Sequence, residues 1–190
     1  HYQNEIIIFV QLTKFKKMEN QSNSKSVILN YGLYLGLATV IISLVKYAMG
    51  ALYNQEYYSG ILGLILTIAF LVLGIKKYKA DNGGFLAFGQ AVKIGIGVAM
   101  ISAIINIVYL LLLTNVLEPD FAINTIEAQK IMMADSFGMT EGQIEEATKN
   151  SLDNFNLSLL GGVLIMNLFI GGIISLIAAA IMKKSEEETY

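Results

Sequence analysis

Side chains that commonly carry enzyme chemistry are scarce in this chain. Cysteine is absent, the sole histidine is His1, and all thirteen basic residues are lysine. Thiol nucleophiles, thiolate or histidine metal sites and bidentate guanidinium clamps are therefore excluded. The remaining serine, threonine, tyrosine, lysine and carboxylate groups form no recognisable set of nucleophile, base and orienting group. We expect no catalytic residue, no metal site and no cofactor, and we interpret the chain as non-enzymatic.

The most distinctive polar residues are two asparagines, Asn106 and Asn167, which lie within long apolar segments. In helices they would lie about 20 and 24 Å from the lysines at one end of their segments, near the middle of a membrane. At that depth an amide either bonds across a helix interface or lines a hydrated route. We predict that the two asparagines hydrogen-bond to each other as packing contacts. A polar pathway for a small solute is the alternative.

Two further groups of residues could bind a ligand, but simpler roles explain them. Lys46 follows an apolar segment and has several tyrosines nearby, a pattern typical of a side chain that anchors a helix end at the membrane interface. The run Asp81, Asn82, Gly83 and Gly84 offers a carboxylate, an amide and backbone N–H groups. Its Asn-Gly-Gly sequence predicts the positive φ angles that reverse a chain between two helices.

Four uncharged stretches position these residues: 26–45, 57–75, 94–117 and 154–182. Each is close to or longer than the roughly 20 apolar residues with which a helix crosses the ~30 Å hydrocarbon layer. Because backbone groups in hydrocarbon must pair within their own segment, such spans are helical. We predict an all-α integral membrane four-helix bundle with spans at about 26–52, 57–77, 88–117 and 154–183.

Residues 18–190 are expected to form a single membrane domain. The first methionine is Met18, and a polar run follows it, as at an ordinary start of translation. Residues 1–17 are interpreted as a misassigned leader or a disordered extension. The alternative is an amphipathic anchor, since Ile6 to Val10 form an apolar block that is too short to span.

Lysines are concentrated on one side of the predicted membrane. They precede the first span, fill the turn between the second and third spans and follow the fourth span, whereas only Lys130 and Lys149 lie in the loop on the other side. By the positive-inside rule, we therefore expect both termini to be cytoplasmic.

The extramembrane segment 118–153 carries eight carboxylates against two lysines. Gly138 predicts a helix stop, and Thr140 with Gln143 predicts a capping box at the start of a second helix. No proline or glycine lies between Gln143 and Leu160, so this second helix is expected to continue into the fourth span. We predict an acidic helical loop between helices three and four. It is either a solvated hairpin over the bundle or a surface for a partner or a cation.

Small residues recur at four-residue spacing on three of the four spans: Gly32 and Gly36, then Gly95, Ala99 and Ala103, then Gly171, Ser175 and Ala179. Such faces let helices approach each other closely. They exceed what four helices need for their own contacts. We therefore predict association with a second copy or with another membrane protein.

Five motifs resemble those of a known family: DNGGFLAFGQAVKIG at 81–95, SVILNYG at 26–32, EPDF at 118–121, GMTEGQI at 138–144, and a glycine-rich fourth span that ends in Lys183 and Lys184. In these motifs the chain is similar to the bacterial membrane family called domain of unknown function 4199. The likeness covers about residues 19–184. It implies a four-span inner-membrane protein of a Gram-negative lineage and implies no activity.

These observations favour an integral membrane protein that acts through helix–helix association or partner binding. Its expected partners are the lipid bilayer and either a second copy or another membrane protein. The alternative is a small channel or transporter subunit with a pathway near Asn106 and Asn167, although the spans contain no carboxylate to carry protons. The net charge of -2 leaves no basic surface for nucleic acid.

Overall fold

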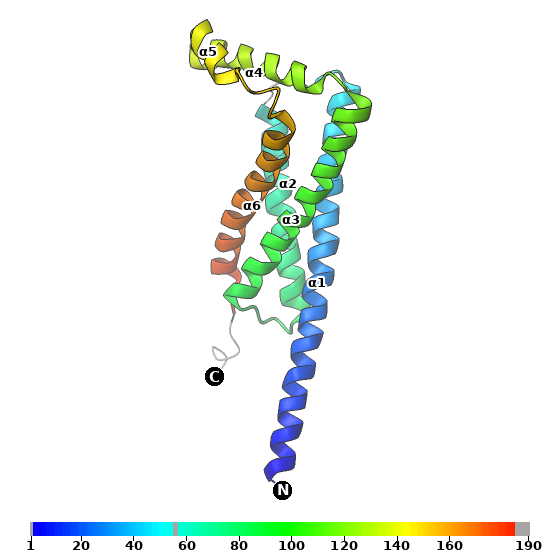
Figure 1. The fold of residues 1–190 in the computed structure, drawn as a ribbon. Coiled ribbons are helices and arrows are strands. Elements are labelled where there is room, and N and C mark those ends of the chain that lie inside the picture. The colour runs from blue at the N-terminus through cyan, green and yellow to red at the C-terminus, as the bar shows by residue number, and fades with distance from the viewer. Residues whose placement is uncertain (1, 55–56, 185–190) are drawn as a thin grey trace.

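The computed structural model describes residues 2–54 and 57–184, and these residues form helices along most of their length (Figure 1). The four long helices are α1 (Tyr2–Ala48), α2 (Tyr57–Asp81), α3 (Phe88–Leu112) and α6 (Phe155–Met182). The π-helical turn η1 (Leu113–Leu117) extends α3, and the shorter helices α4 (Phe121–Phe137) and α5 (Glu141–Thr148) lead to α6. The described residues contain no strand, and one isolated antiparallel bridge joins Leu86 to Lys184. The all-α prediction is confirmed.

Among the described residues, four segments are long and apolar enough to cross a membrane: Ser24–Ala48, Tyr58–Asp81, Phe88–Leu117 and Phe155–Met182. The first helix ends at Ala48, earlier than the expected residue 52. Gly50 takes a left-handed φ of 66°, and the N–H of Ala51 bonds the carbonyl of Lys46 at 2.9 Å, which is a Schellman stop. Towards the N-terminus α1 continues as helix back to Tyr2. A translation start at Met18 stays a prediction.

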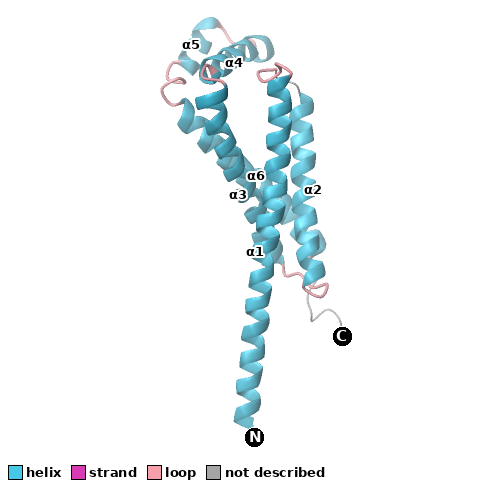
Figure 2. Cartoon of the chain, turned by 90° about the vertical axis from the view of Figure 1, so that its right-hand side faces the viewer, coloured by secondary structure: helices cyan, strands magenta, loops and turns pink. Residues whose placement is uncertain are grey.

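The four long helices run side by side, and α3 packs against α1, α2 and α6 (Figures 1 and 2). The turn between α2 and α3 lies at the same end as the end of α6. We call this end the turn end, and the opposite end, where α4 and α5 lie, the α4 end. In both views α1 extends well beyond the other helices at the turn end.

The apolar core is divided between the two ends. At the turn end it includes Leu35, Leu71, Ile75, Val98 and Ala179, each with at most 1% of its surface exposed. A second buried cluster at the α4 end consists of Tyr109, Leu113, Phe121, Ile126 and Phe155. Residues 58–70 of α2 and 156–170 of α6 contain no buried residue. These halves of α2 and α6 therefore lack the close packing that joins the same helices at the turn end.

Helix α4 lies across the α4 end of the molecule (Figure 1). Gly138 ends it with a φ of 62°, and the backbone N–H of Thr140 donates to the Gln143 side chain at 2.9 Å to begin α5, as predicted. The expectation that α5 continues into α6 is wrong, because the chain turns between residues 149 and 154. There the Asn154 amide donates to the Asn150 carbonyl at 3.2 Å. Short polar side chains compete in this way with helical bonding.

Candidate functional site

The two central asparagines do not bond to each other, which corrects the expectation from their similar depth. The Asn106 amide of α3 donates to the Thr39 hydroxyl of α1 at 2.9 Å and to the Ser102 carbonyl at 2.9 Å. The Asn167 amide donates to the Val163 carbonyl of its own helix at 2.8 Å. Asn106 therefore couples α3 to α1, whereas Asn167 lies on a wall of a cavity described below.

The small-residue faces are used inside the chain. A Cβ added at Gly32 would lie 2.5 Å from Ile101, and one at Gly36 would lie 2.7 Å from Ile105, so α1 and α3 touch at these glycines. Gly95 of α3 faces Ser175 of α6 more closely still, and Gly171 of α6 faces Ala99 of α3. The small-residue faces that we expected to be free for a partner are therefore occupied by contacts between α1, α3 and α6.

The run from Asp81 to Gly84 forms the turn between α2 and α3. Gly83 and Gly84 have φ angles of 66° and 86°, and the Asn82 amide donates to the carbonyl of Phe85 at 2.9 Å. The ammonium of Lys79 donates to the Met182 carbonyl at 2.8 Å, which ties this turn to the end of α6. These contacts give the run a structural role at the turn end.

Lys46 lies at the α4 end, where the loop from α1 to α2 meets the start of α2. Its ammonium donates to the Asn54 carbonyl at 3.2 Å and to the Ser59 hydroxyl at 3.4 Å. Nearby, the Tyr53 hydroxyl donates to the Glu118 carboxylate at 3.2 Å. Burial, and to a smaller degree the Glu118 charge, raises the pKa of Tyr53. The anchoring role of Lys46 at a membrane interface stays a prediction.

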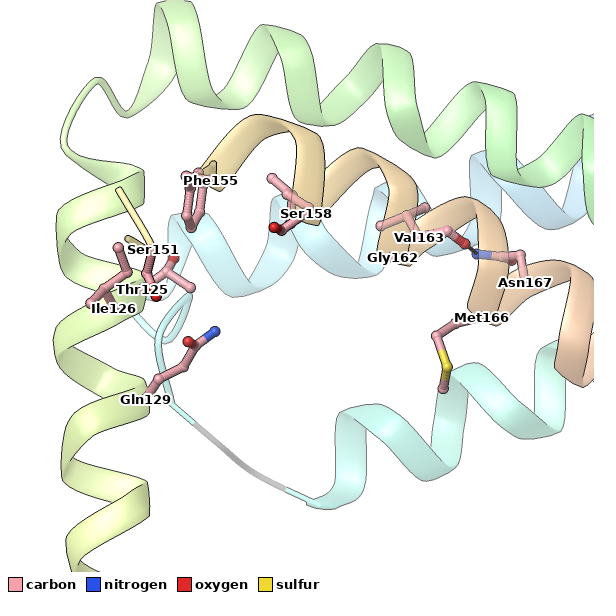
Figure 3. A pocket seen from close by; sticks show the side chains of 11 residues that line it. Thr125, Ile126, Gln129, Ser151, Phe155, Ser158, Gly162, Val163, Met166 and Asn167 are labelled. Atoms are coloured by element: carbon pink, nitrogen blue, oxygen red, sulfur yellow. Dashed lines mark hydrogen bonds between the residues drawn. The ribbon is translucent and has the colours of Figure 1, made fainter. Parts of the chain in front are cut away.

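Two large cavities and a smaller one of about 100 Å³ border α4 in the described part of the chain. The first has a volume of about 470 Å³ and is formed by one face of α6, by α4 and by the turn before α6 (Figure 3). Its polar lining comes from Thr125, Gln129, Ser151, Ser158 and Asn167. The Thr125 hydroxyl is buried and has no hydrogen-bond partner.

The second cavity, of about 770 Å³, lies beside the first along α4. It is lined by Lys46 and Asn54, by Ser59 and Gly60 at the start of α2, and by α4 residues that include Asp135. No ion pair joins Lys46 to any carboxylate among the described residues, nor Asp135 to any lysine. We call the two cavities together the α4 hollow.

Sequence reasoning found Lys46 and Asn167 but did not place them in a shared region. The α4 residues of the hollow were missed, since Thr125, Gln129 and Asp135 look like ordinary residues of a solvated helix. No one-face pattern could have found them, because the α4 residues that line the two cavities, 125, 126, 128, 129, 131, 132, 135 and 136, cover more than half of the helix circumference.

The fold and the site define a class of protein. An all-helical chain with four apolar segments of membrane-spanning length is a multi-pass membrane protein. Residues 30–184 match the family described as protein of unknown function (DUF4199), and the chain belongs to this family. No curated protein and no solved structure matches it. In the described part of the chain, no group of three or more His, Cys, Asp or Glu could hold a metal ion.

Proposed function

We propose that this protein is a non-enzymatic protein of the bacterial inner membrane that acts by binding a membrane-borne partner in the α4 hollow. The carrying observation is the separation of α2 and α6 at the α4 end. A Cβ added at Gly60, Gly63, Gly161 or Gly162 would meet nothing within 4 Å. Small residues that contact nothing leave room for another molecule to approach the helix backbone.

The proposed orientation places both termini in the cytoplasm. Lys76, Lys77, Lys79 and Lys93 flank the turn between α2 and α3, and Lys183 and Lys184 follow α6 at the same end. The acidic segment with α4 and α5 is at the opposite end. The positive-inside rule then puts the turn end in the cytoplasm and the α4 hollow in the outer leaflet.

Self-association through glycine faces receives less support than it did from the sequence. Gly32, Gly36, Gly95 and Gly171 are occupied by contacts within the chain. Four unoccupied glycines of α2 and α6 lie at the α4 end, and two of them, Gly60 and Gly162, line the hollow, whereas the unoccupied Gly172 lies beyond the close contact at Gly171. We therefore place partner binding at the hollow.

A channel or transporter subunit remains the rival proposal, with a route that would begin at the hollow and pass Asn167. Such a route would have to continue through the turn end, where Leu71, Val98 and Ala179 are at most 1% exposed. Asn106 is already bonded to Thr39. Conduction needs polar groups along the whole depth of the membrane, and this packing argues against them.

Photo-crosslinking in native membranes tests the binding proposal. A photoreactive residue at Met166, on the wall of the hollow, is compared with one at Ile181, which is 77% exposed on the same helix at the turn end. We expect a specific adduct from Met166 alone, and its loss when Gly162→Phe fills the hollow. Identical adducts from both positions, or adducts that Gly162→Phe leaves unchanged, would reject the proposal.

The rival is tested by flux into liposomes that contain the purified protein. We expect no ion or small-solute flux above that of empty liposomes. A reproducible flux that Asn167→Leu abolishes would favour the transport function instead.

A further inference from the structure

We infer that the α4 hollow binds a zwitterionic aminophospholipid from the leaflet at the α4 end, with its phosphate at Lys46 and its ammonium at Asp135. This inference rests on the proposed function and names the chemical class of the partner. Depth, the position of α4 and the charges of the second cavity support it.

The depth of the hollow matches one leaflet. On α6 its lining runs from Phe155 to Asn167, about 18 Å along the helix axis. The next buried residue of α6 is Gly171, where α6 comes close to Ala99 and Leu71. Half of a ~30 Å hydrocarbon layer is about 15 Å thick. An acyl chain of one leaflet therefore fits this depth, whereas a partner helix that crosses the membrane would need an open groove through both leaflets.

The position of α4 favours the same occupant. Helix α4 lies across the end of the molecule, and its residues Thr125, Gln129 and Asp135 line the two cavities. A transmembrane helix seated between α2 and α6 would have to continue past α4 into water. A lipid ends at this level, because its headgroup marks the membrane surface.

The charges of the second cavity fit a headgroup that carries both signs. Lys46 and Asp135 line the same cavity, and no ion pair joins them. A phosphate accepts charge-assisted hydrogen bonds from an ammonium, and a lipid amine donates them to a carboxylate. An anionic lipid without an amine would satisfy Lys46 but would leave Asp135 without a cationic partner. The cavity therefore favours an ethanolamine headgroup over a glycerol headgroup.

The size of the hollow also agrees with an amphipathic ligand. Its cavities of about 470 and 770 Å³ fall within the ~300 to 1,000 Å³ of typical ligand sites. The first cavity has apolar lining from Leu159, Val163 and Met166, beside which an acyl chain can lie. The second supplies the charged groups. Chain and headgroup thus each have a matching region.

Native mass spectrometry of the purified full-length protein tests the inference. Phosphatidylethanolamine and phosphatidylglycerol with identical chains are added separately, and bound lipid is titrated. We expect phosphatidylethanolamine to bind about tenfold more tightly, because a hydrogen bond to a charged group is at stake. Lys46→Gln should weaken both lipids about tenfold. Asp135→Asn should weaken only phosphatidylethanolamine and so remove the preference.

Matched controls are Lys149→Gln and Glu141→Gln, which make the same charge changes in the acidic segment outside the second cavity. Both should bind lipid as the unmodified protein does, and helical circular dichroism verifies the fold of each variant. Equal binding of the two lipids, or full binding by Lys46→Gln and Asp135→Asn, would overturn the inference.

The Met166 crosslink separates the two possible failures. If the adduct is a polypeptide, such as a second copy of the chain, the proposed function stands and the lipid inference falls. If Met166 yields no specific adduct and neither lipid binds selectively, the proposed function and the lipid inference are both rejected. An adduct with an ethanolamine lipid that Lys46→Gln removes supports both.

Discussion

Gly32→Ala should separate α1 from α3 and destabilise the protein. The added Cβ would lie 2.5 Å from the Ile101 Cβ and 3.1 Å from the Val98 carbonyl oxygen. Carbon atoms prefer about 3.5 to 4.0 Å, so the helices must shift by about 1 Å. Overpacking of this kind costs about 1 to 3 kcal/mol. The same change offsets up to about 1 kcal/mol of this cost, because alanine favours helices over glycine.

Gly162→Ala is the matched control, since its Cβ would meet nothing within 4 Å. Both variants gain the same helix propensity, so the difference between their unfolding free energies isolates the clash. We expect Gly32→Ala to be less stable than Gly162→Ala by about 1 to 3 kcal/mol. Unfolding in mixed micelles of mild detergent and dodecyl sulfate, followed by circular dichroism, measures this difference. Equal unfolding curves would refute the close contact between α1 and α3.

Three further predictions concern other parts of the molecule. Asn106→Leu and Thr39→Val should each destabilise the protein, and a double-mutant cycle in the same micelles should give a coupling energy of about 0.6 to 2 kcal/mol. Additive effects of the two substitutions would show that the side chains are not bonded. The raised pKa of Tyr53 means that the folded state holds this proton more tightly than the unfolded state. The stability that this group contributes is therefore present below pH 10 and is lost as pH rises above it. Tyr53→Phe should reduce this loss in unfolding experiments from pH 8 to 11, and an unchanged pH dependence would contradict the assignment. Because the chain has no cysteine, single introduced cysteines report the membrane topology. A cysteine at Ser136 should react with an impermeant thiol reagent in intact spheroplasts, and a cysteine at Asn82 should not. The reverse pattern would overturn the proposed orientation.

Features set by local chemistry could be predicted from the sequence. The uncharged stretches located the four spans, Gly138 located the end of α4, and Thr140 with Gln143 located the start of α5. Each depends on neighbouring residues or on hydropathy alone. The Asn-Gly-Gly turn belongs to the same group, since its positive φ angles are a local requirement.

Features that depend on helix rotation and tilt could not be predicted. Depth placed Asn106 and Asn167 at similar levels, but contacts such as Gly32 with Ile101 bring the Asn106 face of α3 to α1. The hollow depends on how far α2 and α6 separate towards the α4 end, and no residue pattern encodes that distance. The break between α5 and α6 was missed because asparagine and serine were not counted as helix-ending residues.

Tryptophan fluorescence tests the central claim most directly, because the chain has no tryptophan of its own. Met166→Trp reports the hollow at a side chain that is itself 55% exposed, and Phe169→Trp reports a position that is 63% exposed on the same helix. Tyr78→Trp reports a position that is only 2% exposed. In bilayers with brominated lipid chains, Met166→Trp should be quenched almost as strongly as Phe169→Trp. Brominated phosphatidylethanolamine should quench it more than brominated phosphatidylglycerol does, while Phe169→Trp shows no headgroup preference. Equal quenching of Met166→Trp by the two brominated lipids would show that the hollow does not select an ethanolamine headgroup and would contradict the account.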